Sequence, residues 1–88
     1  MTDAERRTLA VALTYEAPRA PKVVAVGRGE LGQRIIDVAR THGVPLQEDP
    51  ALAEVLSRVE IDTEIPEQLY QAVAVVLGFV LRANARRS

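Results

Sequence analysis

The sequence has no cysteine and no tryptophan, and aromatic residues make up only 3% of its 88 residues. Without cysteine, disulfide bonds and thiolate metal sites are excluded, which fits a reducing compartment. The N-terminus lacks the apolar core of a signal peptide. The longest apolar stretch, residues 72–81, is too short to span a bilayer. Val, Leu, Ile and Ala must therefore fill the interior of a protein that we expect to be non-membrane-spanning.

The charge balance excludes a strongly basic or acidic protein. The formal net charge is −1, which argues against nucleic acid as the main partner. An apolar fraction of 48% is high enough for one small globular domain. Several arginines gather near the two ends, where we expect solvated side chains, with attachment to an acidic surface as the alternative. These arginines are Arg6, Arg7, Arg82, Arg86 and Arg87.

The apolar runs predict a short sheet. LAVALTY (9–15) and KVVAVG (22–27) read as buried strands, and VPLQE (44–48) as a third. The loop between the first two strands is too short for a helical crossover, so these strands should pair antiparallel. The expected fold class is α/β: a small three-layer α-β-α domain with a short mixed sheet, in the order β-β-α-β-α-α.

Capping residues mark where the helices begin and end. A helix is expected over residues 30–42 and ends before Gly43, a left-handed stop. Asp49 should cap the next helix, with Pro50 at its first position. The expected inner faces of these two helices are Leu31, Ile35, Val38 and Ala39 in the first, and Leu52, Val55, Leu56 and Val59 in the second.

The final helix is expected from Pro66 to about Asn84, with Ile65 packed against its first turn. Its apolar periodicity predicts an inward stripe and a flat, weakly polar opposite face. The inward residues are Leu69, Val73, Val76, Leu77 and Val80. The opposite face carries Gln71, Val75, Gly78 and Arg82. Two uses of this helix stay open: packing broadly over the sheet, or presenting an apolar patch to a partner, including a second copy.

Gly27, Gly29 and Gly32 spell GxGxxG between a strand and a helix, the layout of a dinucleotide-binding turn. Glu48 and Asp49 lie near the place where such sites carry an acidic residue. The antiparallel hairpin and the short chain do not fit that fold, and glycines also permit positive φ and close helix–sheet contact. We expect structural glycines and keep a small nucleotide-binding protein as the alternative.

No other cluster predicts chemistry. His42 is the only histidine and ends a helix, where a positive charge suits the dipole, so we expect no metal site. The acidic group Asp62, Glu64 and Glu67 is better placed to support a helix N-terminus than to perform acid–base catalysis. No nucleophile with a base and an orienting group is present. The sequence predicts no enzyme, no catalytic residue and no cofactor.

Three stretches together identify a family. AVALTY (10–15), APKVVAVGRGELGQRIIDVARTHGVPL (20–46) and EIPEQLYQAVAVVLGFV (64–80) resemble the cytoplasmic C-terminal domain of the flagellar and type III export protein FlhB. The resemblance implies an interaction module of the export apparatus in the cytoplasm, associated with the membrane export machinery. Implied partners are export substrates or membrane export-gate proteins, with the chain a monomer or weak dimer. It also implies a substrate specificity switch.

The family's cleavage motif is missing. The resemblance implies an Asn-Pro-Thr-His motif before the first strand, where the Asn side-chain amide attacks its own carbonyl. Here Glu5, Arg6, Arg7 and Thr8 occupy those positions. A glutamate carboxylate cannot supply that amide nucleophile, so the chain should not cut itself and looks like a free-standing form of the post-cleavage fragment. We expect a flexible segment over residues 1–8, the domain over 9–85 and a tail over 86–88.

Three positions depart from the family's usual charges. Val26 stands where a lysine is usual, Glu54 where an arginine is usual, and Val75 where an acid is usual. A partner that reads those charges would meet a different surface here. The resemblance further implies a partner-binding patch whose matching residues in this sequence are Ala20, Pro21, Ala74 and Leu77.

Overall fold

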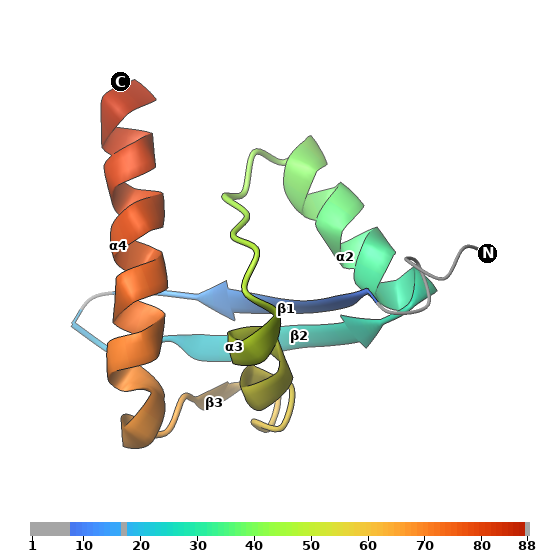
Figure 1. Cartoon of the computed structure of the whole chain (residues 1–88), viewed down its shortest axis with the longest axis horizontal. Helices are drawn as coiled ribbons and strands as arrows, with labels where there is room; N and C mark the ends of the chain where they lie inside the picture. Colours follow the sequence, from blue (N-terminus) through green and yellow to red (C-terminus); the bar gives the residue numbers. More distant parts are fainter. Residues whose placement is uncertain (1–7, 17, 88) are drawn as a thin grey trace.

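A hairpin of two strands is the centre of the fold. β1 (Leu9–Thr14) pairs antiparallel with β2 (Lys22–Arg28), as the short loop between them predicts. A two-residue strand, β3 (Thr63–Glu64), pairs antiparallel with the other side of β2, so the sheet order is β1-β2-β3 (Figure 1). The computed structural model describes residues 8–16 and 18–87.

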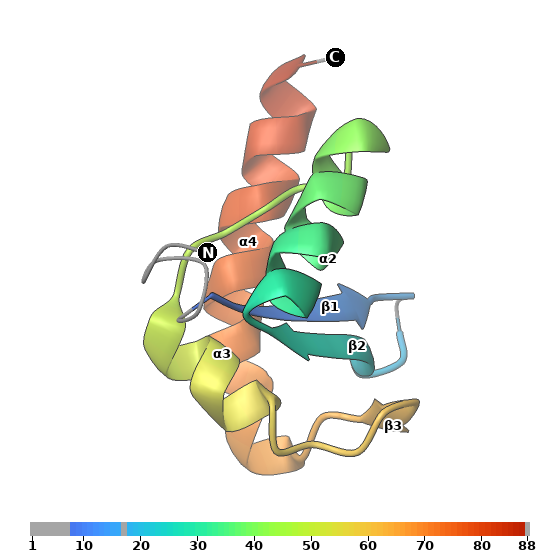
Figure 2. The same ribbon diagram turned by 90° about the vertical axis from the view of Figure 1, so that its right-hand side faces the viewer.

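Helical segments pack around this sheet. In chain order they are α2 (Glu30–Thr41), α3 (Pro50–Leu56), the 3₁₀ turn η1 (Glu67–Leu69) and α4 (Tyr70–Arg87). The C-terminal half of α4 extends beyond the sheet, as both views show (Figure 1, Figure 2). Within the described residues, no helix is both long enough and apolar enough to cross a membrane.

Helices cover both faces of the sheet. A Cβ atom at Gly27 would lie 2.8 Å from Ile35 Cδ1, so this residue faces α2. Its neighbour Val26 packs against a core cluster that contains Leu56 of α3 and Val73 of α4. Because consecutive residues of a strand point to opposite faces, the sheet lies between α2 and the α3–α4 pair. The predicted three-layer α/β class is confirmed.

The third strand does not form where the sequence predicts it. Residues 44–48 are irregular and exposed, and β3 forms instead in the segment expected to be a connector. Asp62, at φ +66°, turns the chain so that its N–H donates to Val23 O at 2.7 Å. The Ile65 N–H then donates to Pro21 O at 2.9 Å. Both strand pairings are antiparallel, so the expected mixed sheet is also wrong.

The predicted helix boundaries at Gly43 and Asp49 are confirmed. Gly43 has φ +69° and donates its N–H to Arg40 O, while the next N–H, of Val44, donates to Ala39 O. This pair of bonds is a Schellman motif, which needs a left-handed residue. The Asp49 carboxylate accepts from the Leu52 N–H at 3.1 Å and caps α3.

The inner face of α2 is narrower than its periodicity predicts. Ile35 and Ala39 are half-buried as expected, whereas Leu31 and Val38 are 54% and 53% exposed. At Gly32, which is buried in the first turn, α2 approaches the strands closely: a Cβ there would lie 2.7 Å from the Gly27 carbonyl oxygen. Beyond that turn the helix leads away from the strands, which leaves part of its apolar stripe uncovered (Figure 1).

The core joins residues far apart in the sequence. Val23, Leu56, Ile65 and Val73 form its buried centre, and Leu77 is among the half-buried residues that pack against it. The final helix therefore buries the predicted stripe where its side chains are described. It begins later than expected, because Pro66 starts the 3₁₀ turn and regular α-helix begins only at Tyr70.

The expected boundaries at residues 8 and 85 can be compared with the structure only in part. Of the segment 1–8, only Thr8 is described, and its carbonyl accepts from the Gly29 N–H at 2.8 Å. The positions that replace the cleavage motif, 5–7, lie outside the described residues. At the other end α4 continues to Arg87, beyond the expected end at about Asn84.

Candidate functional site

Each of the three glycines in the turn has a structural explanation: backbone conformation at Gly29 and close packing at Gly27 and Gly32. Gly29 has φ +62°, a conformation that favours glycine. A Cβ at Gly27 would lie 2.9 Å from the Gly32 nitrogen, and a Cβ at Gly32 would lie 2.7 Å from the Gly27 carbonyl oxygen. The motif thus lets α2 start directly against β2, and no bound phosphate is needed to account for it.

Ala20 and Pro21 lead into β2. Ala20 is half-buried and Pro21 is buried. The Pro21 carbonyl accepts from the Ile65 N–H, which ties this entry to the segment that precedes α4. The proline ring is therefore held within the fold, and Ala20 is the more accessible member of the pair.

Ala74 and Leu77 lie on α4 at different depths. Ala74 is exposed, whereas Leu77 is half-buried and packs against the core cluster. Val73, next to Ala74, and Val23, two residues after Pro21, belong to that same cluster. Leu77 thus packs against this core, Pro21 and Ala74 are within two positions of a core residue, and Ala20 precedes Val23 by three.

The apolar character of α4 extends beyond Ala74. Tyr70 precedes it by four positions, one helical turn, and is 45% exposed. Val75, which replaces the family's usual acid, is 54% exposed. Tyr70 and Ala74 are thus exposed one turn apart on the same side of the helix, and Val75 is exposed about 100° further round it.

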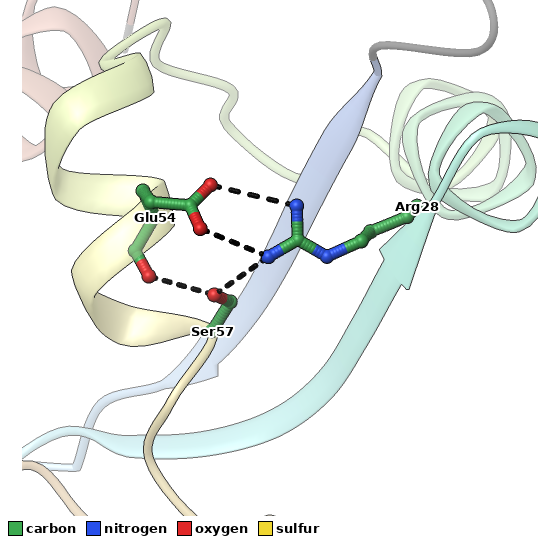
Figure 3. Close-up of polar contacts among 3 residues, drawn as sticks. All are labelled: Arg28, Glu54 and Ser57. Carbon is green, nitrogen blue, oxygen red and sulfur yellow. Dashed lines mark hydrogen bonds and ion pairs between the residues drawn. The ribbon is translucent and has the colours of Figure 1, made fainter.

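A charge cluster that the sequence analysis did not predict joins β2 to α3. Arg28 Nη2 donates to Glu54 Oε1 at 3.1 Å and to Ser57 Oγ at 3.2 Å, and Nη1 donates to Glu54 Oε2 at 3.4 Å (Figure 3). The hydrogen bond and charge of Arg28 lower the pKa of the Glu54 carboxyl. Glu54 was noted only as a departure from the family's arginine, and nothing local in the sequence pairs it with a residue 26 positions earlier.

The remaining candidates stay apart. His42 is exposed at the end of α2, and Glu64 and Glu67 are exposed in β3 and η1. Asp49 is occupied as a helix cap and Val26 packs against the core cluster. Across residues 8–16 and 18–87, no group of three or more His, Asp or Glu side chains is placed to hold a metal ion.

Sequence comparison finds relatives over most of the chain. The uncharacterized protein YlqH of Bacillus subtilis is 41% identical over 77 residues, covering 85% of this chain and 83% of YlqH. The flagellar biosynthetic protein FlhB of Salmonella typhimurium is 49% identical over 73 residues, covering 80% of this chain but 19% of FlhB. The chain thus spans about a fifth of the FlhB proteins it matches, as also in Aquifex aeolicus, where the share is 22%.

Solved structures share the fold. The PscU C-terminal domain superposes with a TM-score of 0.76 at 30% identity, covering 81% of this chain and 94% of that one. A point mutant of the EscU/SpaS C-terminal domain gives 0.78 at 25% identity, covering 84% and 95%. Residues 7–80 match the family described as FlhB, HrpN, YscU and SpaS. The chain therefore belongs to this family of type III and flagellar export proteins and has the fold of their C-terminal domain.

Proposed function

We propose that this chain is a non-enzymatic interaction module of a flagellar or related type III export apparatus. In this proposal it works in the cytoplasm beside the membrane export machinery and binds export substrates or export-gate proteins. Family membership supports the export role. The observation that carries the binding role is the exposure of Ala74 on a weakly polar side of α4.

The proposed binding patch consists of Ala20, Pro21, Ala74 and Leu77. Ala74 and Leu77 are three positions apart and so lie on one side of the helix. In the proposed patch, the small side chain of exposed Ala74 would leave room beside the half-buried Leu77 for an apolar anchor of a partner. Ala20 is accessible in part, and buried Pro21 fixes the backbone beneath it.

A patch of this size should bind weakly. A small interface must offset the lost rigid-body entropy of its partner, which leaves affinities in the micromolar range or weaker. Weak binding suits a component from which an export substrate must leave again.

The experiment is capture of flagellar rod or hook subunits by the immobilised chain, with and without Ala74→Asp. Because Ala74 is exposed, the aspartate should stay solvated and the variant should remain folded. We expect capture to be lost in Ala74→Asp and kept in Val38→Asp, a matched control on the exposed side of α2. Equal capture by a folded Ala74→Asp variant would show that the patch is wrongly placed.

A further inference from the structure

A shallow apolar groove lies on a different surface, between the C-terminal end of α3, β3 and η1. It has a volume of about 470 Å³. Its apolar walls are Val55, Val59, Pro66 and Leu69, and Arg58 and Glu64 are among the polar residues at its border. Val55, expected on the inner face of its helix, is instead 42% exposed here. The groove excludes Ala20, Pro21, Ala74 and Leu77.

The groove borders an open edge of the sheet. β3 is last in the described strand order, and Thr63 and Glu64 both line the groove. The Ile65 N–H donates inward, to the carbonyl of Pro21 directly before β2. Because the backbone groups of consecutive strand residues alternate between the two sides, the N–H and C=O of Glu64 point to the outer edge. An extended segment could continue the sheet there and place alternate side chains in the groove.

The charges around the groove select the partner. Of the charged residues, Arg58 and Glu64 line the groove itself. The segment 58–68, which supplies most of the lining, has one cation and four exposed carboxylates, so its net charge is −3. The carboxylates are those of Glu60, Asp62, Glu64 and Glu67. A segment with this negative charge favours peptides with lysine or arginine beside their apolar residues and disfavours acidic ones.

We propose that this groove binds an extended peptide segment with alternating apolar residues and basic flanks, added as a strand to the outer edge of β3. Backbone hydrogen bonds at Glu64 would set the register, Val55 and Leu69 would contact the apolar side chains, and the carboxylates would select the charge. The inference concerns this surface alone, so it does not depend on the export role.

The test uses synthetic peptides and the full chain. The probe is Lys-Thr-Val-Thr-Val-Thr-Lys, titrated by NMR or calorimetry. One comparison peptide carries Glu in place of both Lys residues. The other carries N-methyl groups on alternate residues, which block the backbone N–H groups on the side that would pair with β3. We expect the basic peptide to bind at sub-millimolar concentration, and each comparison peptide to bind about tenfold more weakly or not at all.

Protein variants locate the binding surface. Val55→Asn should weaken binding of the basic peptide about tenfold. Val38→Asn, at a helical valine elsewhere that is also exposed, should change this binding less than about twofold. Neither variant alters the charge. Ala74→Asp should leave this binding intact. The proposal is overturned if the basic peptide does not bind at about 5 mM, if N-methylation has no effect, or if folded Val55→Asn binds as well as the original chain.

Discussion

Replacing Gly32 with alanine sets two effects of opposite sign against each other. Gly32 lies in the first turn of α2, and alanine has a helix propensity about 1 kcal/mol more favourable than glycine. The added methyl group, however, would lie 2.7 Å from the Gly27 carbonyl oxygen and 3.0 Å from the Thr8 carbonyl oxygen. Both neighbours are backbone atoms, so the clash can be relieved only if helix and sheet move apart.

The steric effect should win. Overpacking costs up to about 3 kcal/mol when the neighbours cannot yield. When the gain of about 1 kcal/mol in helix propensity is subtracted, the free energy of unfolding falls by about 2 kcal/mol. Each kcal/mol shifts the melting temperature of a domain this size by roughly 4–8 °C, so Gly32→Ala should melt roughly 8–16 °C lower.

The control compares alanine with glycine at an exposed position of the same helix. Arg34→Ala and Arg34→Gly should differ by about 1 kcal/mol in favour of alanine, because Arg34 is exposed. Thermal melting followed by circular dichroism measures all three variants. If Gly32→Ala melts higher than the original chain, helix and sheet do not need this close approach, and the packing explanation of the glycine turn fails.

Three further outcomes follow from the same geometry. Asp49→Ala should lower the free energy of unfolding by about 1 kcal/mol in a urea titration, whereas Asp49→Asn should keep most of the cap. Since Arg28 lowers the pKa of folded Glu54, the pairing stabilises the fold above the ordinary carboxyl pKa and is lost as pH falls through the lowered value. Melting temperatures at falling pH should therefore drop more for the original chain than for Glu54→Gln, and an identical profile would remove the pairing from the stability argument. Millimolar NAD should not raise the melting temperature; binding tighter than about 100 μM that Gly29→Val abolishes would restore the nucleotide-binding alternative.

Features fixed by local chemistry could be predicted from the sequence. The Asp49 cap and the left-handed Gly43 depend on neighbours within a few positions, and both are confirmed. The antiparallel hairpin followed from the short loop, and the family from the three matching stretches. In each case the decisive interaction is close in sequence or the motif is specific.

The third strand was predicted in the wrong segment because contacts between residues distant in sequence determine where it forms. Residues 44–48 have a strand-like composition, but they pair with no strand of the described sheet and are irregular and exposed. β3 has only two residues, Thr63 and Glu64, and forms through antiparallel pairing with Val23 and Lys22 of β2. No propensity can indicate so short a strand.

Helical periodicity also could not give the depth of burial. It identified the apolar stripe of α2 but not that Leu31 and Val38 would stay exposed once the helix leads away from the strands. The Arg28–Glu54 pair was equally hidden, because it joins two elements 26 positions apart. Both features depend on how the layers pack, which a single sequence does not encode locally.

The proposed export role is tested most directly by an NMR titration of the isotope-labelled chain with an N-terminal segment of a flagellar rod or hook subunit. We expect weak, saturable shifts centred on Ala74 and Leu77 of α4 and reaching Ala20 at the entry to β2, with an affinity in the micromolar to millimolar range. These shifts should vanish in Ala74→Asp and persist in Val38→Asp. No shifts at millimolar peptide, or shifts confined to the groove at Val55, would contradict the proposed binding patch on α4.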